Sequence, residues 1–324
     1  MKKIEMILNL FNNTNTTTQP ELSSEMKTHY SNTLIDNAKA NLVHDQFGQK
    51  QPIPKNGGKT ILFRKYNPLG KAVTPLTEGV TPNGQQLSVQ KIEATVEQYG
   101  GYVELSDMFI TTSVDNNVNQ AATLLGAQAG ETMDTIIREK LSGGTNVQYA
   151  DGSVSARTAL SCTNANHKLT VLAVQKAVRF LKKQKARPFE DGCFVAIIHP
   201  DVTFDLTRDP EWIDAVKYAG SEKLLTGEIG KIRGCRFVET TEAKVFTGAG
   251  AGGCNVYSTL VVAKNAYGVT DIDNGGVETI IKPLGSGGTH DPLNQRATVG
   301  WKATRTAEIL MESFMVRIET ACSV

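Results

Sequence analysis

The sequence has almost no net charge, only 6% aromatic residues and no long apolar run. Its 324 residues include 34 Lys and Arg against 33 Asp and Glu, a formal charge of +1. This balance excludes the basic excess of a dedicated nucleic-acid-binding protein. No segment approaches the roughly 18 apolar residues of a membrane-spanning helix. With 40% hydrophobic and 21% charged residues, the composition predicts a folded chain of one large or two modest domains.

Cysteine is scarce and odd in number, at five residues. None of them forms a CxxC pair, which argues against a metal or redox motif, and an odd set is a poor disulfide framework. We therefore predict buried free thiols in a reducing cytosol. The five are Cys162, Cys193, Cys235, Cys254 and Cys322.

The N-terminal residues are unusually polar. In residues 1–19, two lysines precede an apolar stretch, but Glu5 and Asn9 interrupt it and no small-residue cleavage site follows, so we expect no signal peptide. The Asn/Thr-rich remainder cannot bury enough apolar surface to order itself and needs an external partner. Residues 20–47 have apolar side chains at helical spacing. They predict an amphipathic helix, either docked on its own core or laid across a neighbouring subunit.

Residues 59–106 predict a long two-stranded ribbon. The first arm is KTILFRKY, and the second, from about residue 87, alternates apolar and polar side chains. The loop of about 20 residues between the arms contains three prolines and has no core. A lone hairpin is only marginally stable in water, so a ribbon of this kind requires a partner surface.

The rest of the chain alternates helix and strand patterns. Residues 115–142 have the strongest helical periodicity, which ends at Gly143 and Gly144. Residues 145–285 alternate amphipathic helices with short apolar runs such as GCFVAIIHP, and residues 296–321 add two strand-like runs. These patterns predict an α+β fold class.

The sequence offers no catalytic, metal-binding or cofactor-binding constellation. Gly248, Gly250 and Gly253 match the GxGxxG pattern, but a strand pattern follows where a dinucleotide site needs a helix. We interpret these glycines as a hairpin turn. The five histidines are scattered over the chain, and we interpret His199, at a strand end before a proline, as a structural group.

A basic run ends one of the predicted helices. It contains Lys182, Lys183, Lys185 and Arg187. We interpret this run as a solvated helix end, because no aromatic residues are interleaved with it as they would be in a nucleic-acid-binding patch.

Several stretches of sequence from about residue 26 onward resemble one protein family. They are LVHDQFGQKQPIPKNGGKTILFRKYNPL with LTEGVTPNG, GGYVELSDMFITTSVDNNVNQAATLLGAQAGETMDTIIREKL, IIHPDVTFDLTRDPEW with GEIGKIRGCRFVET, and DPLNQRATVGWKATRTAEIL. On these residues the chain resembles the major capsid protein of a tailed bacteriophage, in particular the family of the phage N-four coat protein. The resemblance implies the Hong Kong 97 (HK97-type) capsid fold.

The resemblance also implies a domain organisation. Residues 1–56 would form an N-terminal arm and residues 57–106 an extended β-ribbon loop that reaches over a neighbouring subunit. Residues 107–144 would form a peripheral domain with a long spine helix, residues 145–288 an axial domain, and residues 289–324 the return strands of the peripheral domain. The arm and the ribbon, which cannot stabilise themselves, are the elements that this template lays on neighbours.

By the same resemblance, copies of the chain would assemble into hexamers and pentamers of an icosahedral shell around phage double-stranded DNA. The expected partners are other copies, a portal and a separate scaffolding protein, with no membrane, no cofactor, no sequence-specific DNA binding and no enzymatic activity. We expect assembly in the bacterial host cytoplasm and a final location in the virion. The near-zero net charge fits a wall that must enclose DNA without condensing it.

Opposite charges in the blocks that carry the resemblance suggest inter-subunit contacts. The candidates are Arg64, Lys65 and Glu78 of the ribbon, with Arg296 and Arg305 of the tail as charged partners. Two alternative functions remain open: an encapsulin-like nanocompartment shell, which shares the fold but encloses enzymes, and an α/β nucleotide-binding enzyme that uses the turn at residues 248–253. Protein cargo in place of DNA would favour the first, and a nucleotide-induced rise in melting temperature the second.

Overall fold

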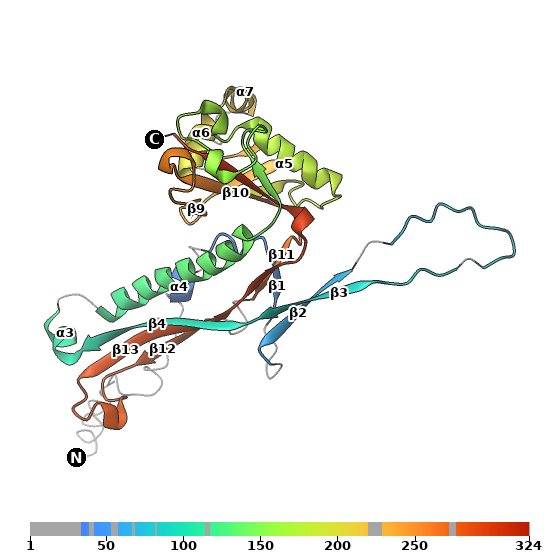
Figure 1. Cartoon of the computed structure of the whole chain (residues 1–324). Helices are drawn as coiled ribbons and strands as arrows, with labels where there is room; N and C mark the ends of the chain where they lie inside the picture. The colour runs from blue at the N-terminus through green and yellow to red at the C-terminus, as the bar shows by residue number, and fades with distance from the viewer. Residues whose placement is uncertain are drawn as a thin grey trace, which may run out of the picture. The chain divides into compact units, whose positions relative to one another are not determined.

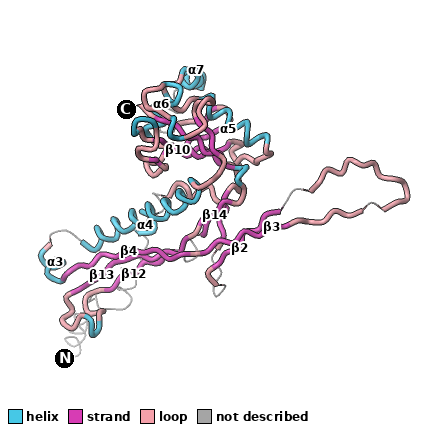
Figure 2. Tube along the Cα trace, viewed as in Figure 1, coloured by secondary structure: helices cyan, strands magenta, loops and turns pink. Residues whose placement is uncertain are grey.

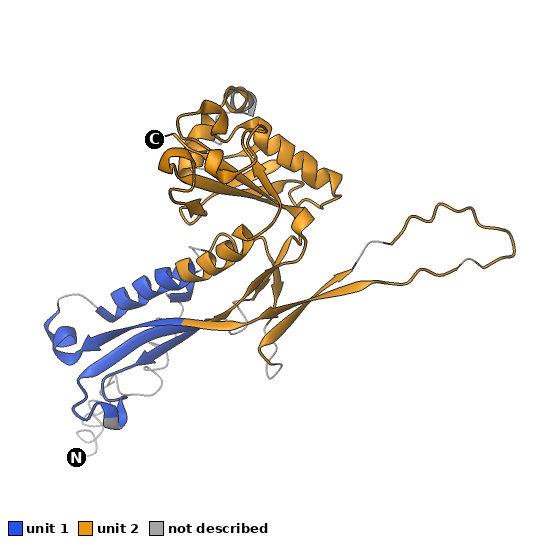
Figure 3. Ribbon diagram, viewed as in Figure 1, with its two compact units in different colours: residues 1–41, 100–130, 277–302 blue, residues 42–99, 131–276, 303–324 orange. Residues whose placement is uncertain are grey.

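The computed structural model describes most of the chain (Figure 1). The described residues are 34–38, 42–52, 58–66, 69–81, 83–113, 117–219, 229–271 and 277–323. The chain divides into two compact units, which are coloured separately in Figure 3. Unit 1 comprises residues 1–41, 100–130 and 277–302, and unit 2 comprises residues 42–99, 131–276 and 303–324. None of the helices in the described ranges combines the length and the apolarity that crossing a bilayer requires.

Unit 2 contains a mixed seven-stranded sheet (Figure 1). Its order is β5 (Val147–Tyr149), β15 (Met315–Ala321), β10 (Val256–Val262), β6 (Phe194–Ile198), β8 (Cys235–Glu239) and β7 (Lys231–Ile232), with β9 (Val245–Phe246) paired to β10. Strand β10 is antiparallel to β15 and β6, whereas β6 and β8 are parallel. The central strand β6 has the sequence FVAII and is buried at every position, which fits the prediction of a strand covered on both faces.

The helices of this sheet domain start at recognisable signals. Thr170 caps α5 (Val171–Lys183), its hydroxyl accepting from the Ala173 N–H at 3.3 Å. Helices α6 (Pro200–Thr207) and α7 (Pro210–Ala219) each begin with proline, whose fixed φ suits a first helical turn. The apolar face of α5 shares one buried core with residues of β6, β8, β10 and β15. Short 3₁₀ turns of unit 2 are η1 (Arg157–Ala159), η2 (Ala165–His167), η4 (Ala251–Gly253) and η6 (Glu312–Phe314).

A second sheet and a ribbon complete unit 2. Strand β1 (Gln49–Gln51) runs parallel to β11 (Tyr267–Thr270), and β14 (Ala307–Ile309) runs antiparallel to β11. Strands β2 (Thr60–Tyr66) and β3 (Val89–Thr95) pair antiparallel along their whole length. Along β2, buried and exposed side chains alternate, as the sequence pattern predicts for a half-buried strand.

Unit 1 contains a three-stranded sheet and helical segments. The sheet order is β12 (Val277–Lys282), β13 (Arg296–Arg305) and β4 (Glu97–Ser106). Helix α3 (Asp107–Thr112) follows β4, η5 (Gly288–His290) precedes β13, and residues 117–130 of α4 (Asn117–Ser142) belong to this unit. Gly126 of α4 permits a close approach of the helical residues 34–38, because a Cβ there would lie 2.7 Å from the Leu34 carbonyl oxygen.

The structure confirms the helix with the strongest sequence pattern and corrects two other predicted elements. The helix predicted at residues 115–142 is α4. The predicted polar segment 1–19 and most of the helix predicted at residues 20–47 lie outside the described residues, but residues 43–48 form turns instead of helix. The second ribbon arm is two strands: Val96 donates its N–H to the Lys59 carbonyl at 2.8 Å, and β4 beyond it joins β13 instead of β2.

Strand pairing also corrects the predicted domain limits in two places. Strand β15, predicted among the return strands of residues 289–324, lies between β5 and β10 in the seven-stranded sheet. Strand β12, predicted within the axial segment 145–288, is paired with β13. Local sequence specifies that a strand forms but leaves its partner undetermined, since partners are chosen by tertiary packing.

The prediction that all five cysteines are free thiols is wrong. Cys162 and Cys254 form a disulfide with their Cα atoms 5.9 Å apart, although 92 residues separate them in sequence. Backbone contacts bring the two segments together, because the Ala251 N–H donates to the Leu160 carbonyl at 2.7 Å. Spacing in sequence cannot reveal such a pair. The free cysteines in the described part of the chain are Cys193, Cys235 and Cys322.

The glycine-rich motif and His199 have the structural roles that we predicted. The motif is the turn between β9 and β10, which pair antiparallel, and a strand follows it. Gly248 and Gly252 have φ values of 65° and 68°, a left-handed conformation that favours glycine. His199 caps α6, its Nδ1 accepting from the Asp201 N–H at 3.1 Å.

Candidate assembly surfaces

The ribbon of unit 2 ends in a long loop without helix or strand (Figure 2). We define the ribbon loop as its described residues, 69–81 and 83–88, all of which are exposed. Hydrogen bonds within it include Val80 N–H to the Thr77 carbonyl at 3.2 Å and the Gln85 amide to the Gly70 carbonyl at 3.3 Å. The loop therefore has local turns but no core of its own.

The ribbon and its loop expose eight large apolar side chains. Leu76 in the loop is 77% exposed. A series of this kind is unusual on a monomeric protein and typical of a surface that another protein covers. The eight are Leu62, Tyr66, Leu69, Val73, Leu76, Val80, Leu87 and Val89.

The base of the ribbon, in contrast, is packed within the chain. Ile61, Phe63 and Ala94 form a small buried cluster with Leu310. The Phe63 ring lies directly over Gly268 of β11, where a Cβ would collide with it. The ribbon is therefore anchored at one end, and the apolar loop begins beyond the anchored part.

A buried polar cluster fixes the segment that leads into β1. Asp134 of α4 accepts from the backbone N–H groups of Val43 and His44 at 3.0 and 2.8 Å, and its second oxygen lies 2.6 Å from His44 Nδ1. The Tyr267 hydroxyl donates to the His44 carbonyl. Burial raises the pKa of Tyr267 well above its usual value, so the phenol stays a neutral donor.

The two arginines predicted as contacts in the tail have different environments. Arg305 is 2% exposed, and its guanidinium donates to the Asp45 carboxylate and the Thr270 carbonyl. The prediction of an inter-subunit contact is corrected here, because the side chain is enclosed and paired within its own chain. Arg296 lies 3.2 Å from Glu104, and both side chains are exposed, so this pair contributes little stability.

The three predicted contact residues of the ribbon are charged and form no ion pair within the described part of the chain. Arg64 and Lys65 lie on β2, and Glu78 is exposed in the ribbon loop. In the register, Arg64 stands opposite Lys91 of β3. Like charges directly opposite one another destabilise a strand pair. No ion pair joins Arg64, Lys65 or Glu78 to any residue that the structure describes.

A second buried charge cluster lies in the seven-stranded sheet. Glu319 of β15 receives two hydrogen bonds from Arg157, at 2.6 and 2.8 Å, and lies 2.9 Å from Arg317 Nε. Arg317 also donates to the Ser142 carbonyl, and the Arg157 guanidinium stacks 3.4 Å from the Phe246 ring centroid. Sequence reasoning missed this cluster, because charged residues in a strand are equally compatible with solvent exposure.

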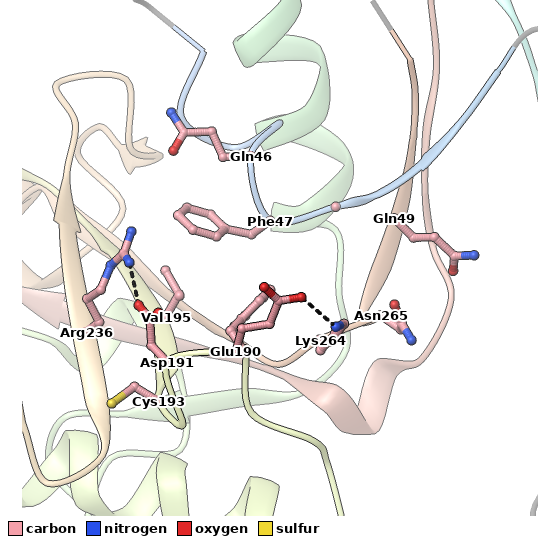
Figure 4. Close-up of a pocket in the computed structure, with 12 residues that line it drawn as sticks. Gln46, Phe47, Gln49, Glu190, Asp191, Cys193, Val195, Arg236, Lys264 and Asn265 are labelled. Atoms are coloured by element: carbon pink, nitrogen blue, oxygen red, sulfur yellow. Dashed lines mark hydrogen bonds and ion pairs between the residues drawn. The ribbon is translucent and has the colours of Figure 1, made fainter.

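A cavity of about 410 Å³ lies between the segment before β1 and the loop before β6 (Figure 4). Phe47 and Phe189 meet in it edge to face, with ring centroids 5.7 Å apart. Asp191 lies 2.8 Å from Arg236, whose hydrogen bond lowers the pKa of that carboxyl. The charged side chains that line the cavity thus pair with one another. The described residues contain no cluster of three His, Cys, Asp or Glu suited to a metal ion.

Comparison with known proteins gives a consistent result. A family described as "Phage capsid protein" matches residues 89–317. The solved capsid of Ralstonia phage GP4 is similar with a TM-score of 0.66 at 14% identity, over 87% of this chain and 89% of that chain. The capsid of cyanophage Pam1 gives 0.62 at 19% identity, over 88% and 92%. A virus-like particle from Pyrococcus furiosus gives 0.51 at 11% identity, over 89% and 97%. No match was found among curated protein sequences.

Proposed function

Since this chain belongs to the phage capsid protein family, we propose how its copies join. The protein is a structural major capsid protein with the Hong Kong 97-type fold, and its place is the capsid shell of the virion. In our proposal, copies form hexamers and pentamers, and these close an icosahedral shell around double-stranded DNA. The ribbon loop of each copy lies on a neighbouring copy.

The exposed apolar series of the ribbon carries this proposal. The loop has no core, and its base is fixed to the chain by Phe63 and its neighbours. An anchored ribbon with an uncovered apolar end gains stability only by burying that end on another surface. A second copy of the chain is the partner that a shell supplies at every position.

The charges of the ribbon support the same arrangement. Arg64 and Lys91 repel one another across the strand pair, and no described residue of the chain offsets them. A carboxylate from a neighbour would relieve this repulsion. Glu78 is an exposed carboxylate of the ribbon loop with no ion pair to a described residue, and it can supply that carboxylate to a neighbouring copy. We therefore keep Arg64, Lys65, Glu78 and Arg296 as proposed inter-subunit contacts.

The remaining parts of the chain fit roles in this scheme. Residues 1–56 would act as the N-terminal arm, residues 100–130 and 277–302 of unit 1 as the peripheral domain, and the seven-stranded sheet with its helices as the axial domain. A portal and a separate scaffolding protein would guide closure of the shell, and assembly would occur in the host cytoplasm. These partners rest on the family resemblance, not on a contact within the chain.

Replacing Leu76 tests the proposal. We expect Leu76→Ser to leave the melting temperature of the free subunit unchanged, because the side chain is largely exposed in the free chain. The same change should lower the fraction of protein that sediments as shells, while Leu76→Met, which keeps the apolar surface, should assemble normally. Shells formed by Leu76→Ser at wild-type yield and stability would contradict the proposed docking of the loop.

The contents of purified shells decide between a capsid and a nanocompartment. Nuclease-protected double-stranded DNA is expected for the capsid proposal. A defined protein cargo in its place would favour the nanocompartment. The enzyme alternative loses its structural basis, because the turn at residues 248–253 precedes a strand.

A further inference from the structure

The C-terminal half of α5 and the turn between β7 and β8, both in unit 2, line a basic groove. Its volume is about 530 Å³, and no carboxylate is among the described residues that line it. The lining residues are Gln175, Val178, Arg179, Lys182, Lys183 and Arg233. We call the exposed cations of this groove, together with Lys185 just beyond the helix end, the α5 patch.

The cations of the α5 patch have no carboxylate partner among the described residues. None of the five forms an ion pair with a residue in the described ranges. Other lysines of unit 2 do: Lys231, next to the same turn, lies 3.6 Å from Asp191, and Lys244 lies 2.7 Å from Glu139. Glu211, a carboxylate beside the groove, accepts a hydrogen bond from neutral Gln175 at 3.2 Å.

The helix dipole accounts for only part of the patch. Lys182 and Lys183 occupy the last turn of α5, where cations are favoured by the partial negative charge of the helix end. Lys185 and Arg233 lie outside any helix. Their presence needs a different explanation.

Lys185 occupies a position where glycine is the usual residue. The Lys185 N–H donates to the Lys182 carbonyl and the Ala186 N–H to the Leu181 carbonyl, both at 3.0 Å, which is the hydrogen-bond pattern of a Schellman motif. The residue between helix and loop in this motif is left-handed, and Lys185 has φ 57°. A side chain with a Cβ is strained there, so the lysine occupies this position against the local backbone preference.

Arg233 presents the same conflict in a second turn. Strands β7 and β8 are joined by two residues, Arg233 and Gly234, with φ 49° and 82°. Two positive φ values define a type I′ hairpin, whose first position favours asparagine, aspartate or glycine. Two independent turns beside one groove thus both carry a cation where the backbone prefers glycine or asparagine. Strained positions of this kind concentrate at functional sites.

We propose that the α5 patch binds the phosphate backbone of duplex DNA. This rests on the proposed function, in which the shell encloses double-stranded DNA. Cations that point into solvent without carboxylate partners suit phosphate oxygens. Among the described lining residues no aromatic side chain offers the stacking platform of a single-strand binder. Val178, the apolar residue in that set, is buried and offers no anchor to a protein partner.

The near-neutral chain limits the strength of this contact. The formal charge of +1 means that cations gathered at the α5 patch are balanced by carboxylates elsewhere. Binding should therefore be local, independent of DNA sequence and strongly dependent on salt. If five cations each neutralise one phosphate, the association constant falls about 500-fold between 50 and 200 mM salt.

Anisotropy of a labelled 20-base-pair duplex, titrated with the unassembled full-length chain at several salt concentrations, tests the proposal. The informative variants are Lys185→Gly and Arg233→Asn, which relieve the backbone conflict while removing charge. We expect each to melt at or above the wild-type temperature and yet to bind the duplex more weakly. The 500-fold salt effect should fall to about 150-fold in each single variant and to about 40-fold in the double variant.

Lys264→Gln is the matched control, because Lys264 is an exposed lysine of unit 2 that lies outside the patch and pairs with Glu190. This variant should bind the duplex with the affinity of the wild-type protein. Unchanged duplex binding in the two informative variants would overturn the proposal. So would tighter binding of polyglutamate than of duplex at equal charge concentration, which would point to an acidic protein segment instead. Sedimentation of the same proteins tests the shell function separately from DNA binding. Subunits that form shells but do not bind the duplex would refute DNA binding by the α5 patch and leave the proposed shell function intact.

Discussion

The seven-stranded sheet and the ribbon loop contain similar side chains in opposite environments. Strands β6 and β15 are buried at every position, whereas every described residue of the ribbon loop is exposed. Both regions are rich in valine and leucine or isoleucine. The first region obtains its stability from burial within one chain, and in our proposal the second obtains it only from burial between chains. Folding of the subunit and assembly of the shell are therefore encoded in separate parts of the sequence.

Charged residues follow the same division. In the sheet, Glu319 is buried and satisfied by two arginines. On the ribbon, Arg64 and Lys91 face one another without a described partner. A mutation in the first group should affect the free subunit, and a mutation in the second should affect only the assembled particle. Each of the following changes tests one side of this division.

Removing the carboxylate of Glu319 should have the largest effect. Glu319→Ala leaves Arg157 and Arg317 without their shared partner, and breaking a buried ion pair in this way costs about 3–5 kcal/mol of unfolding free energy. Glu308→Ala is the control, because its pair with Lys140 is largely solvated and is worth below about 1 kcal/mol. Urea denaturation of unassembled subunits measures the loss of unfolding free energy in each variant. Equal losses in the two variants would contradict the assignment of Glu319 to the folding core.

Opening the disulfide should have the next largest effect. Replacing both Cys162 and Cys254 by serine removes a link across 92 residues, which typically costs about 2–4 kcal/mol. Cys193→Ser, which changes a free cysteine, should alter the unfolding free energy far less. Thiol titration in denaturant provides an independent count, with three reactive groups expected before reduction and five after it. Five groups before reduction would show that the bridge is not formed in the purified protein.

The sequence predicted the elements whose signals are local. The periodicity of α4, the apolar run of β6, the alternation along β2 and the hairpin at residues 248–253 were all visible without coordinates. Tertiary packing decides the features that sequence reasoning missed. The partner of β15, the Cys162–Cys254 pair and the burial of Arg305 each join segments far apart in the chain, so no local pattern contains them.

Site residues divide in the same way. A ribbon loop without a core of its own could be predicted, because the absence of a core is a property of the segment itself. Whether a charged side chain is buried or exposed could not be predicted, since Arg296 and Arg305 lie on the same strand and differ in exposure. The left-handed backbone of Lys185 and Arg233 was equally invisible, because a lysine or arginine in a turn carries no signal of its φ value.

Glu78 should show the smallest effect, and only in the particle. Its side chain has no described partner within the chain, so Glu78→Ala should leave subunit unfolding unchanged and weaken association by up to about fivefold for each contact.

Exchanging the charges of Glu78 and Arg64 sharpens the test. If Glu78 of one copy meets Arg64 of another, Glu78→Lys and Arg64→Glu should each reduce shell yield, and the double variant should recover it, because the attraction is restored with its signs reversed. Glu190→Ala, at another exposed carboxylate, should change neither yield nor shell melting. Wild-type shell stability in Glu78→Ala, or a double variant that is worse than both single ones, would remove Glu78 from the interface and leave the apolar loop as the contact between copies.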